Sequence, residues 1–185
     1  PASASLKRPS SRQLAAVRRR PARRSPSGDI SHVLGTYAGA KDQDGLPHGW
    51  GRCAGVEGTY EGHFCHGARQ GEGEMRFADG SICRGQFHAN MPHGRCEYFD
   101  PEDMTTLTGT YVNGELHGPA VQADEAGRLI FRGWFASDTR AGVAEVFDEY
   151  GGRVIGQVDD EGDHTGDNIL YVFPDDRTAL VGTFE

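Results

Sequence analysis

Histidines that recur next to glycines are the side chains of this chain most suggestive of metal chemistry. His48, His93 and His117 each directly precede a glycine of a repeated pattern. In consecutive β-hairpins, equivalent positions lie two strands apart, roughly 9.6 Å at about 4.8 Å per strand. Zinc holds each nitrogen ligand at about 2.0–2.1 Å, so one ion cannot bridge the three. His63 and His66, three residues apart in one hairpin, are a weak signal, and we interpret all five histidines as turn and surface residues.

The four cysteines offer the other soft ligands. Cys53, Cys65, Cys83 and Cys96 are separated by 12, 18 and 13 residues, so the chain has no Cys-x-x-Cys motif, and it carries no secretory signal. Spacing of this kind favours small apolar residues in a reducing compartment over a disulfide framework or a zinc knuckle.

Catalytic patterns are absent from the sequence. The acids Asp159, Asp160, Glu161 and Asp163 cluster at an expected turn, where a solvated loop is the default. Gly-Glu-Gly at 71–73 does not open a helix, so it is no phosphate-binding loop. The sequence has neither Gly-x-Ser-x-Gly nor His-Glu-x-x-His. We therefore predict no catalytic, cofactor-binding or metal-binding residue in this chain, and expect the repeats to form a scaffold.

Two columns of glycine organise the chain instead. One recurs at Gly62, Gly85, Gly109, Gly133, Gly156 and Gly182, in steps of 23, 24, 24, 23 and 26 residues. The other recurs at Gly49, Gly71, Gly94, Gly118, Gly142 and Gly166, in steps of 22, 23, 24, 24 and 24 residues. Two columns that keep one period indicate a structural repeat.

Each repeat predicts two short strands and two turns. Tyr60, Gly62 and Phe64 are two apart, so in a strand they share one face, and the glycine leaves room for a neighbouring ring. Gly67, Asn90, Gly114, Asp138 and Gly162 occupy the expected turns, where residues that tolerate positive φ are favoured. The positions that define the repeat are Tyr60, Gly62, Phe64, Gly71, Gly85, Phe87, Gly94, Gly109, Tyr111, Gly118, Gly133, Phe135, Gly142, Gly156, Gly166, Gly182 and Phe184.

The predicted fold class follows from the short period. About 23 residues hold two strands but no helix of ordinary length, so we expect an all-β chain forming an elongated, single antiparallel sheet of consecutive hairpins. Each hairpin buries its core against the next. A closed barrel or a sandwich also has short strands and glycine turns, but one motif per hairpin at a strict period favours the open sheet.

Charge divides the chain into two regions. Residues 1–28 hold eight of the 19 basic residues and no acid, so residues 29–185 hold 11 basic and 27 acidic residues, a net charge of −16. We expect residues 1–34 to be a disordered Arg-rich tail. The tail is open to three interpretations: a nuclear-localisation or polyanion-binding cluster around residues 18–24, a mitochondrial transit peptide, or a stretch that is not native.

The array itself is expected to span residues 35–185. Its first unit, at 30–56, is degenerate, as terminal repeats often are. About six hairpin units follow from the period, with the last incomplete, so we expect the natural protein to continue. No run approaches the roughly 18 apolar residues of a membrane span. We expect a soluble or peripheral protein without a transmembrane segment, whose acidic array does not bind DNA directly.

The repeat resembles the MORN (membrane occupation and recognition nexus) motif, which residues 60–80 match almost position for position. Particular segments also resemble the N-terminal MORN region of the SET-domain protein-lysine methyltransferases that monomethylate histone tails and other proteins. These segments are Asp-Gly-Leu-Pro-His-Gly at 44–49, Gly-Thr-Tyr-Val-Asn-Gly-Glu-Leu-His-Gly-Pro-Ala at 109–120, Gly-Arg-Leu-Ile-Phe at 127–131 and Tyr-Val-Phe-Pro-Asp-Asp-Arg-Thr-Ala-Leu at 171–180. The resemblance covers about residues 44–184.

The resemblance implies a role without implying catalysis by this chain. In such proteins a C-terminal SET domain binds S-adenosylmethionine and the substrate lysine, and the MORN array supports that domain and its choice of substrate. The Asn-His-Ser segment of the SET domain does not occur here, so no catalytic or cofactor residue carries over. The implied partners are the SET domain, histone tails and other lysine-containing proteins, and the implied locations are the nucleus, on chromosomes, and the cytoplasm.

The basic tail departs from the family pattern, in which that stretch is acidic, and this favours the non-native interpretation. A stand-alone MORN scaffold that binds partner proteins or acidic membrane lipids is the second functional hypothesis.

Overall fold

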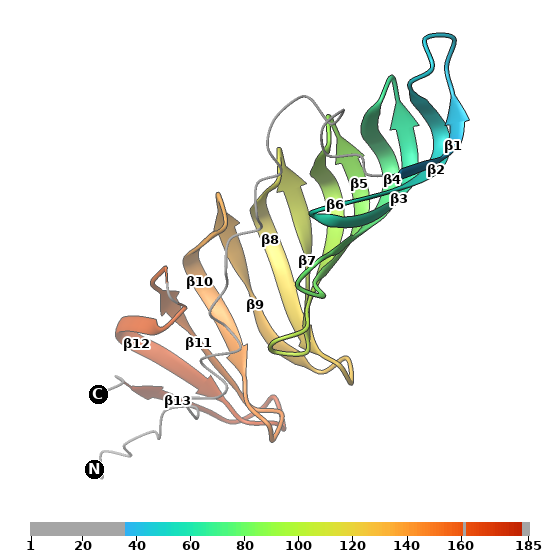
Figure 1. Cartoon of the computed structure of the whole chain (residues 1–185). Helices are drawn as coiled ribbons and strands as arrows, with labels where there is room; N and C mark the ends of the chain where they lie inside the picture. The colour runs from blue at the N-terminus through green and yellow to red at the C-terminus, as the bar shows by residue number, and fades with distance from the viewer. Residues whose placement is uncertain (1–35, 161, 183–185) are drawn as a thin grey trace. The chain divides into compact units, whose positions relative to one another are not determined.

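The computed structural model describes residues 36–160 and 162–182, and all regular elements within these ranges are β-strands. The strands pair in the order in which they follow along the chain, each antiparallel to the next (Figure 1). They are β1 (Thr36–Lys41), β2 (Pro47–Gly55), β3 (Gly58–Cys65), β4 (Ala68–Phe77), β5 (Ile82–His88), β6 (Met91–Asp100), β7 (Thr105–Val112), β8 (Glu115–Asp124), β9 (Leu129–Ala136), β10 (Thr139–Phe147), β11 (Arg153–Val158), β12 (His164–Val172) and β13 (Ala179–Gly182). The expected all-β fold, a single antiparallel sheet of consecutive hairpins, is confirmed.

Two compact units divide the chain, with Leu116 in one and His117 in the other. The first contains β1 to β7, and the second contains β9 to β13, with nearly all of β8. The Arg-rich tail predicted over residues 1–34 lies outside the described residues, as does Phe184.

Alternation along strands such as β3 and β7 creates one buried face. In β3, Tyr60, Gly62 and Phe64 are buried while Glu61 and His63 between them are exposed. The buried rings interlock across strands: Tyr60 meets Phe64 edge-on at 5.2 Å and Phe87 of β5 at 5.0 Å between centroids. Each such aromatic pair contributes about 0.5–1.5 kcal/mol beyond its area burial.

The glycine between two large residues makes room for a ring. The Tyr60 ring lies over the glycines of β3 and β4, and a Cβ built on Gly73 would stand 2.2 Å from the Tyr60 hydroxyl. In the second unit, a Cβ on Gly133 would stand 2.5 Å from Cζ of Phe131. A methyl group at either glycine would therefore overlap an aromatic side chain.

The second glycine column has a different cause. Gly71 and Gly142 have φ of +81° and +73°, and the strand pairing shifts register around them. These are β-bulges with a residue in the left-handed region, where glycine carries no steric penalty. Gly49, Gly94, Gly118 and Gly166 share the positive φ.

Three hairpin turns of the first unit hydrogen-bond to the preceding hairpin. The amide of Gly67 donates to the carbonyl of Pro47 at 2.8 Å, that of Asn90 to Arg69 at 3.1 Å, and that of Gly114 to Pro92 at 2.9 Å. The turn residues singled out from the sequence, Gly67, Asn90, Gly114, Asp138 and Gly162, all have positive φ, as predicted. Neighbouring repeats are thus joined by turn hydrogen bonds as well as by strand pairing.

Candidate functional site

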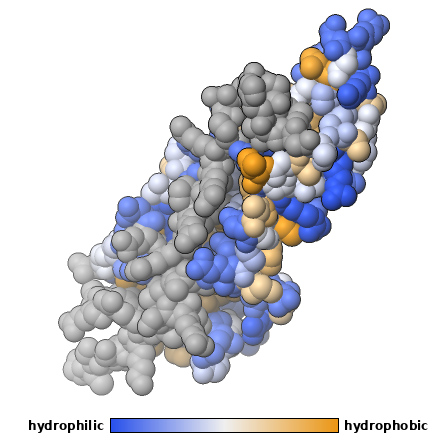
Figure 2. Space-filling model, viewed as in Figure 1, coloured by the Kyte–Doolittle hydropathy of each residue, from blue (hydrophilic) through white to orange (hydrophobic). Residues whose placement is uncertain are grey.

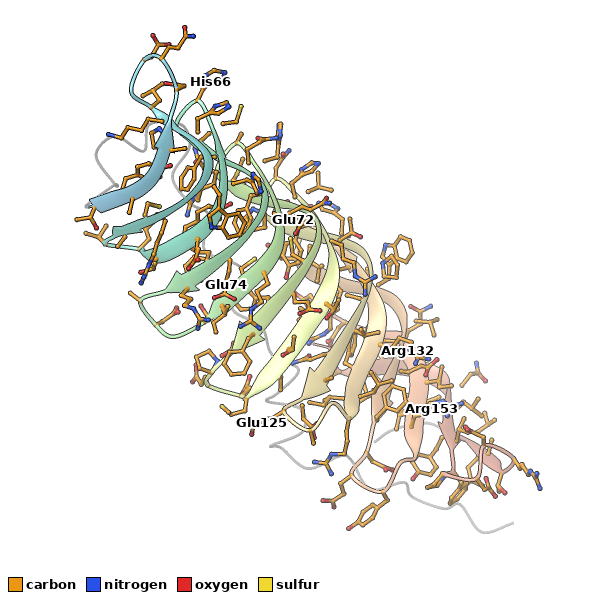
Figure 3. The ribbon with its side chains drawn as sticks, turned by 90° about the vertical axis from the view of Figure 1, so that its right-hand side faces the viewer. His66, Glu72, Glu74, Glu125, Arg132 and Arg153 are labelled. Carbon is orange, nitrogen blue, oxygen red and sulfur yellow. The ribbon has the colours of Figure 1, made fainter. Side chains whose placement is uncertain are left out.

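The outer face of the sheet carries paired charges. Glu74 of β4 forms ion pairs with Arg76 of the same strand, at 2.6 Å, and with Arg84 of β5. The Arg84 guanidinium, which hydrogen-bonds to the carboxylate, lowers the pKa of Glu74 below its usual value. Figure 3 shows this face with Glu74 labelled. Exposed pairs of this kind contribute about 0–1 kcal/mol each, so the face offers an ordered charge pattern more than stability.

The second unit repeats this arrangement. Glu145 of β10 lies between Arg132 of β9, at 3.6 Å, and Arg153 of β11, at 3.5 Å. Glu145 and Glu74 each stand three residues after a bulge glycine, so the repeat places a carboxylate between flanking cations in both units.

Acidic residues gather in the loops on one side of each unit. In the first unit, the loops at 56–57, 78–81 and 101–104 connect one hairpin to the next and lie on the same side, since the strands alternate in direction. They contain Glu57, Asp79, Glu102 and Asp103. Burial and the nearby negative charges of Asp100 and Glu102 raise the pKa of Asp103, which indicates mutual repulsion at this loop.

The corresponding loops of the second unit are also acidic. They lie at 125–128, 148–152 and 173–178 and are bordered by the acids Asp124, Glu125, Asp148, Glu149, Asp175 and Asp176. Several of these carboxylates shape their own loops: Oδ1 of Asp148, for example, accepts hydrogen bonds from the amides of Tyr150 and Gly152. The predicted acidic turn around Asp159 and Asp163 joins β11 to β12 at the other side of the unit and is shaped in the same way, because Asp159 Oδ1 accepts the amide of Asp163 at 2.9 Å.

Histidines gather on the opposite side of the first unit, where the hairpins turn. Three of the histidines discussed above, His48, His66 and His93, are at or beside these turns, and the ring of His88 contacts that of His93 at 5.5 Å. His48, Cys65 and His66 also place their ligand atoms within 4.8 Å of one another. They are the residues of the described chain that could hold a metal ion.

The cysteines divide into two groups. Cys53, Cys83 and Cys96 are buried, in agreement with their interpretation as small apolar residues, whereas Cys65 is exposed. The interpretation was therefore wrong for Cys65, because β3 alternates and Cys65 follows the buried Phe64.

Two buried arginines were missed by sequence reasoning. Arg69 lies 5.6 Å from the centroid of the Tyr60 ring, and Arg140 lies 4.7 Å from that of Phe131. Both stand two residues before a bulge glycine, which places them on the buried face. Their spacing from the second glycine column is the signal that could have identified them. The rings attract the buried guanidinium groups through cation–π contacts.

Several large apolar side chains of the described residues are exposed. Trp50 and Trp134 are each 54% exposed, on β2 and β9. On the face in view in Figure 2, most of the coloured surface is hydrophilic or intermediate. No helix in the described part of the chain is long and apolar enough to cross a membrane.

Both units match families of known proteins. Residues 60–82, 83–103 and 108–123 match the MORN repeat family, and residues 135–185 match the family described as histone H3 K4-specific methyltransferase SET7 N-terminal. The histone-lysine N-methyltransferase SETD7 of Halocynthia roretzi is 38% identical over 162 residues, which make up 87% of this chain and 42% of that protein. The chain thus spans less than half the length of the curated relative it matches.

The sheet of glycine-punctuated hairpins and these matches define a MORN-repeat protein. More narrowly, the chain belongs to the family of SET-domain histone- and protein-lysine N-methyltransferases, in which it corresponds to the MORN-repeat N-terminal region.

Proposed function

We propose that this chain is the platform on which the catalytic SET domain of a protein-lysine methyltransferase rests, and that it contributes to the stability of that domain and its choice of substrate. The observation that carries the proposal is the continuous match to a histone-lysine N-methyltransferase over 162 residues, through both units. The described residues include buried arginines and a regular charged face, but no residue to which we assign a step of methyl transfer. In this proposal, S-adenosyl-L-methionine is bound by the SET domain and by no residue of this chain.

The acidic loops support a part in substrate choice. Histone tails are rich in lysine and arginine, and an acidic surface raises their local concentration through long-range attraction. Salt screens such attraction, with a Debye length of about 8 Å at physiological ionic strength. We expect the full methyltransferase to act on histone tails and other lysine-containing proteins, in the nucleus on chromosomes and in the cytoplasm.

A chimeric enzyme tests the platform role. The chain would replace the matching N-terminal region of the Halocynthia relative, and the chimera would be compared with the remaining C-terminal part alone. We expect the chimera to have a higher Tm and a higher kcat/KM on intact histones, with a smaller gain on a short lysine peptide. Equal stability and equal activity of the two proteins on both substrates would contradict the proposal.

A liposome assay separates this function from a stand-alone scaffold that binds acidic lipids. Vesicles of phosphatidylserine and phosphatidylcholine would be sedimented with residues 35–185. Because this array is acidic, we expect it to stay in the supernatant. Strong sedimentation that salt abolishes would favour the lipid-binding scaffold.

A further inference from the structure

A cluster of metal-ligating side chains lies at the turn side of the first unit. The imidazoles of His48 and His66 and the thiol of Cys65 bring one ligand atom each within 4.8 Å of the others. Strand register creates this cluster: Gly49 of β2 pairs with Phe64 of β3, so the preceding His48 stands opposite Cys65. His66 follows Cys65 directly in the β3–β4 turn. The three residues therefore meet across one strand spacing, and the two-strand separation that excludes His93 does not apply to them.

A carboxylate orients one of the two imidazoles. Asp42, in the β1–β2 turn, has Oδ2 at 3.0 Å from Nδ1 of His66. Its other oxygen accepts the amides of Asp44 and Leu46, which fixes the carboxylate in the turn. When Nδ1 of His66 donates to Asp42, Nε2 carries the lone pair and can ligate a metal. Carboxylate–histidine–metal arrangements of this kind orient the ring and strengthen the ligand.

Equivalent turns show that the geometry is general and that only the side chains differ. In the hairpins that follow, His93 Nδ1 lies 3.4 Å from the amide of Asn113, and His117 Nε2 lies 3.4 Å from Oγ of Ser137. The repeat thus brings the residue before the bulge glycine to the next turn each time. Among the described residues, His48 is the residue before a bulge glycine that lies opposite both a cysteine and a second histidine.

We propose that His48, Cys65 and His66 bind a zinc ion, with the fourth coordination position open to water. A thiolate and two imidazoles are ligands that zinc favours. For tetrahedral zinc, bond lengths of about 2.3 Å to sulfur and 2.0–2.1 Å to nitrogen place the ligand atoms about 3.5 Å apart. Small rotations of exposed side chains close the remaining distance, and the side chain of His66 is 70% exposed.

The ion would connect segments on either side of the β2–β3 hairpin. It would join the start of β2 to the end of β3 and, through Asp42, to the β1–β2 turn. Since the unfolded chain does not hold these ligands together, binding favours the folded first unit. Zinc would therefore stabilise the first repeats and not the second unit.

Zinc uptake by the purified full chain tests the proposal. The protein would be prepared under reducing conditions with an affinity tag free of histidine, and zinc would be titrated against a chromophoric chelator. We expect one zinc ion per chain and, with cobalt(II) in its place, a thiolate-to-cobalt charge-transfer band in the near ultraviolet. C65A should abolish the band, and H48Q and H66Q should each abolish stoichiometric uptake. D42N should weaken zinc affinity by about 10- to 100-fold, as is typical when the carboxylate that hydrogen-bonds to a ligating histidine is replaced.

The neighbouring histidine pair supplies a matched control. His88 and His93 lie 5.5 Å apart between ring centroids but face no cysteine, so H93Q should leave uptake and the cobalt spectrum unchanged. The side chains of His48, Cys65 and His66 are exposed, whereas Asp42 and His93 are partly buried, and circular dichroism would verify that each variant is folded. The proposal is overturned if the wild-type chain takes up no zinc. It is also overturned if C65A binds as tightly as wild type, or if H93Q weakens binding as much as H66Q does.

Discussion

The contact between the Tyr60 ring and Gly73 allows a quantitative test of the repeat. An ideal Cβ on Gly73 would lie 2.2 Å from the hydroxyl oxygen of Tyr60, 2.5 Å from Cζ and 2.6 Å from Cε2. The φ of Gly73 lies outside the left-handed region, so an alanine meets no backbone strain there. The cost of G73A is therefore steric, and overpacking a well-filled core typically costs about 1–3 kcal/mol.

A double-mutant cycle separates this collision from other effects. Tyr60→Leu removes the three atoms that the new methyl group would meet. We expect G73A to lower the free energy of unfolding by about 1–3 kcal/mol with Tyr60 present and to have little effect with leucine there. The coupling energy would then equal most of the cost of G73A.

Urea unfolding followed by circular dichroism and by Trp50 fluorescence provides the measurement. Trp50 is in β2 of the same unit and is half-exposed, so it reports on this unit without belonging to the Tyr60 cluster. An unchanged m-value would show that the substitution leaves the surface exposed between the folded and the unfolded state the same. Strict additivity of the two substitutions, or a neutral G73A, would refute the steric explanation.

Three further expectations concern the second unit. Burial lowers the pKa of His164 below 6.5, so the unfolded state binds the proton more tightly than the folded state does. The free energy of unfolding should therefore be highest above about pH 6.5, fall as the pH drops below that value, and level off below the pKa of the folded state. H164Q should flatten this pH dependence in urea titrations followed by Trp134 fluorescence, and an unchanged slope would contradict the assignment. G142A, with φ of +73° and nothing within 4 Å of its new Cβ, should cost about 1–2 kcal/mol by backbone strain alone, whereas an asparagine there should cost less. E145Q should cost less than about 1 kcal/mol and the loss should largely vanish in 1 M salt, because Glu145 and its two arginines are still partly open to solvent. A loss that persists at high salt would indicate a buried role.

Much of the fold could be predicted because the repeat period is short. Alternation around Gly62 identified the buried face, and the turn residues identified where the chain reverses. The physical reason for the second glycine column could not be read in advance, since a bulge depends on the pairing register of two strands. The buried Arg69 was missed for the same reason: an arginine beside glycine appears solvated until the register places it over a ring.

The cluster of His48, Cys65 and His66 could not be predicted from the spacing of equivalent residues. The spacing comparison placed His48 and His93 too far apart to share an ion, but it compared each residue only with the equivalent residue of another repeat. His48 meets Cys65 and His66 because adjacent strands run in opposite directions, which brings non-equivalent positions of the repeat together. One pairing, Gly49 with Phe64, would have been enough to find the cluster.

The backbone hydrogen bonds from three turns of the first unit to the preceding hairpin run in one direction along the chain. The amides of Gly67, Asn90 and Gly114 each donate to a carbonyl about 20 residues nearer the N-terminus. As the polypeptide leaves the ribosome, each of these three amides therefore finds its acceptor already synthesised, whereas the amide of Arg69 meets its acceptor, Oδ1 of Asn90, only with the next hairpin. Such short sequence separations favour fast folding, and the first unit can therefore close one hairpin after another during translation.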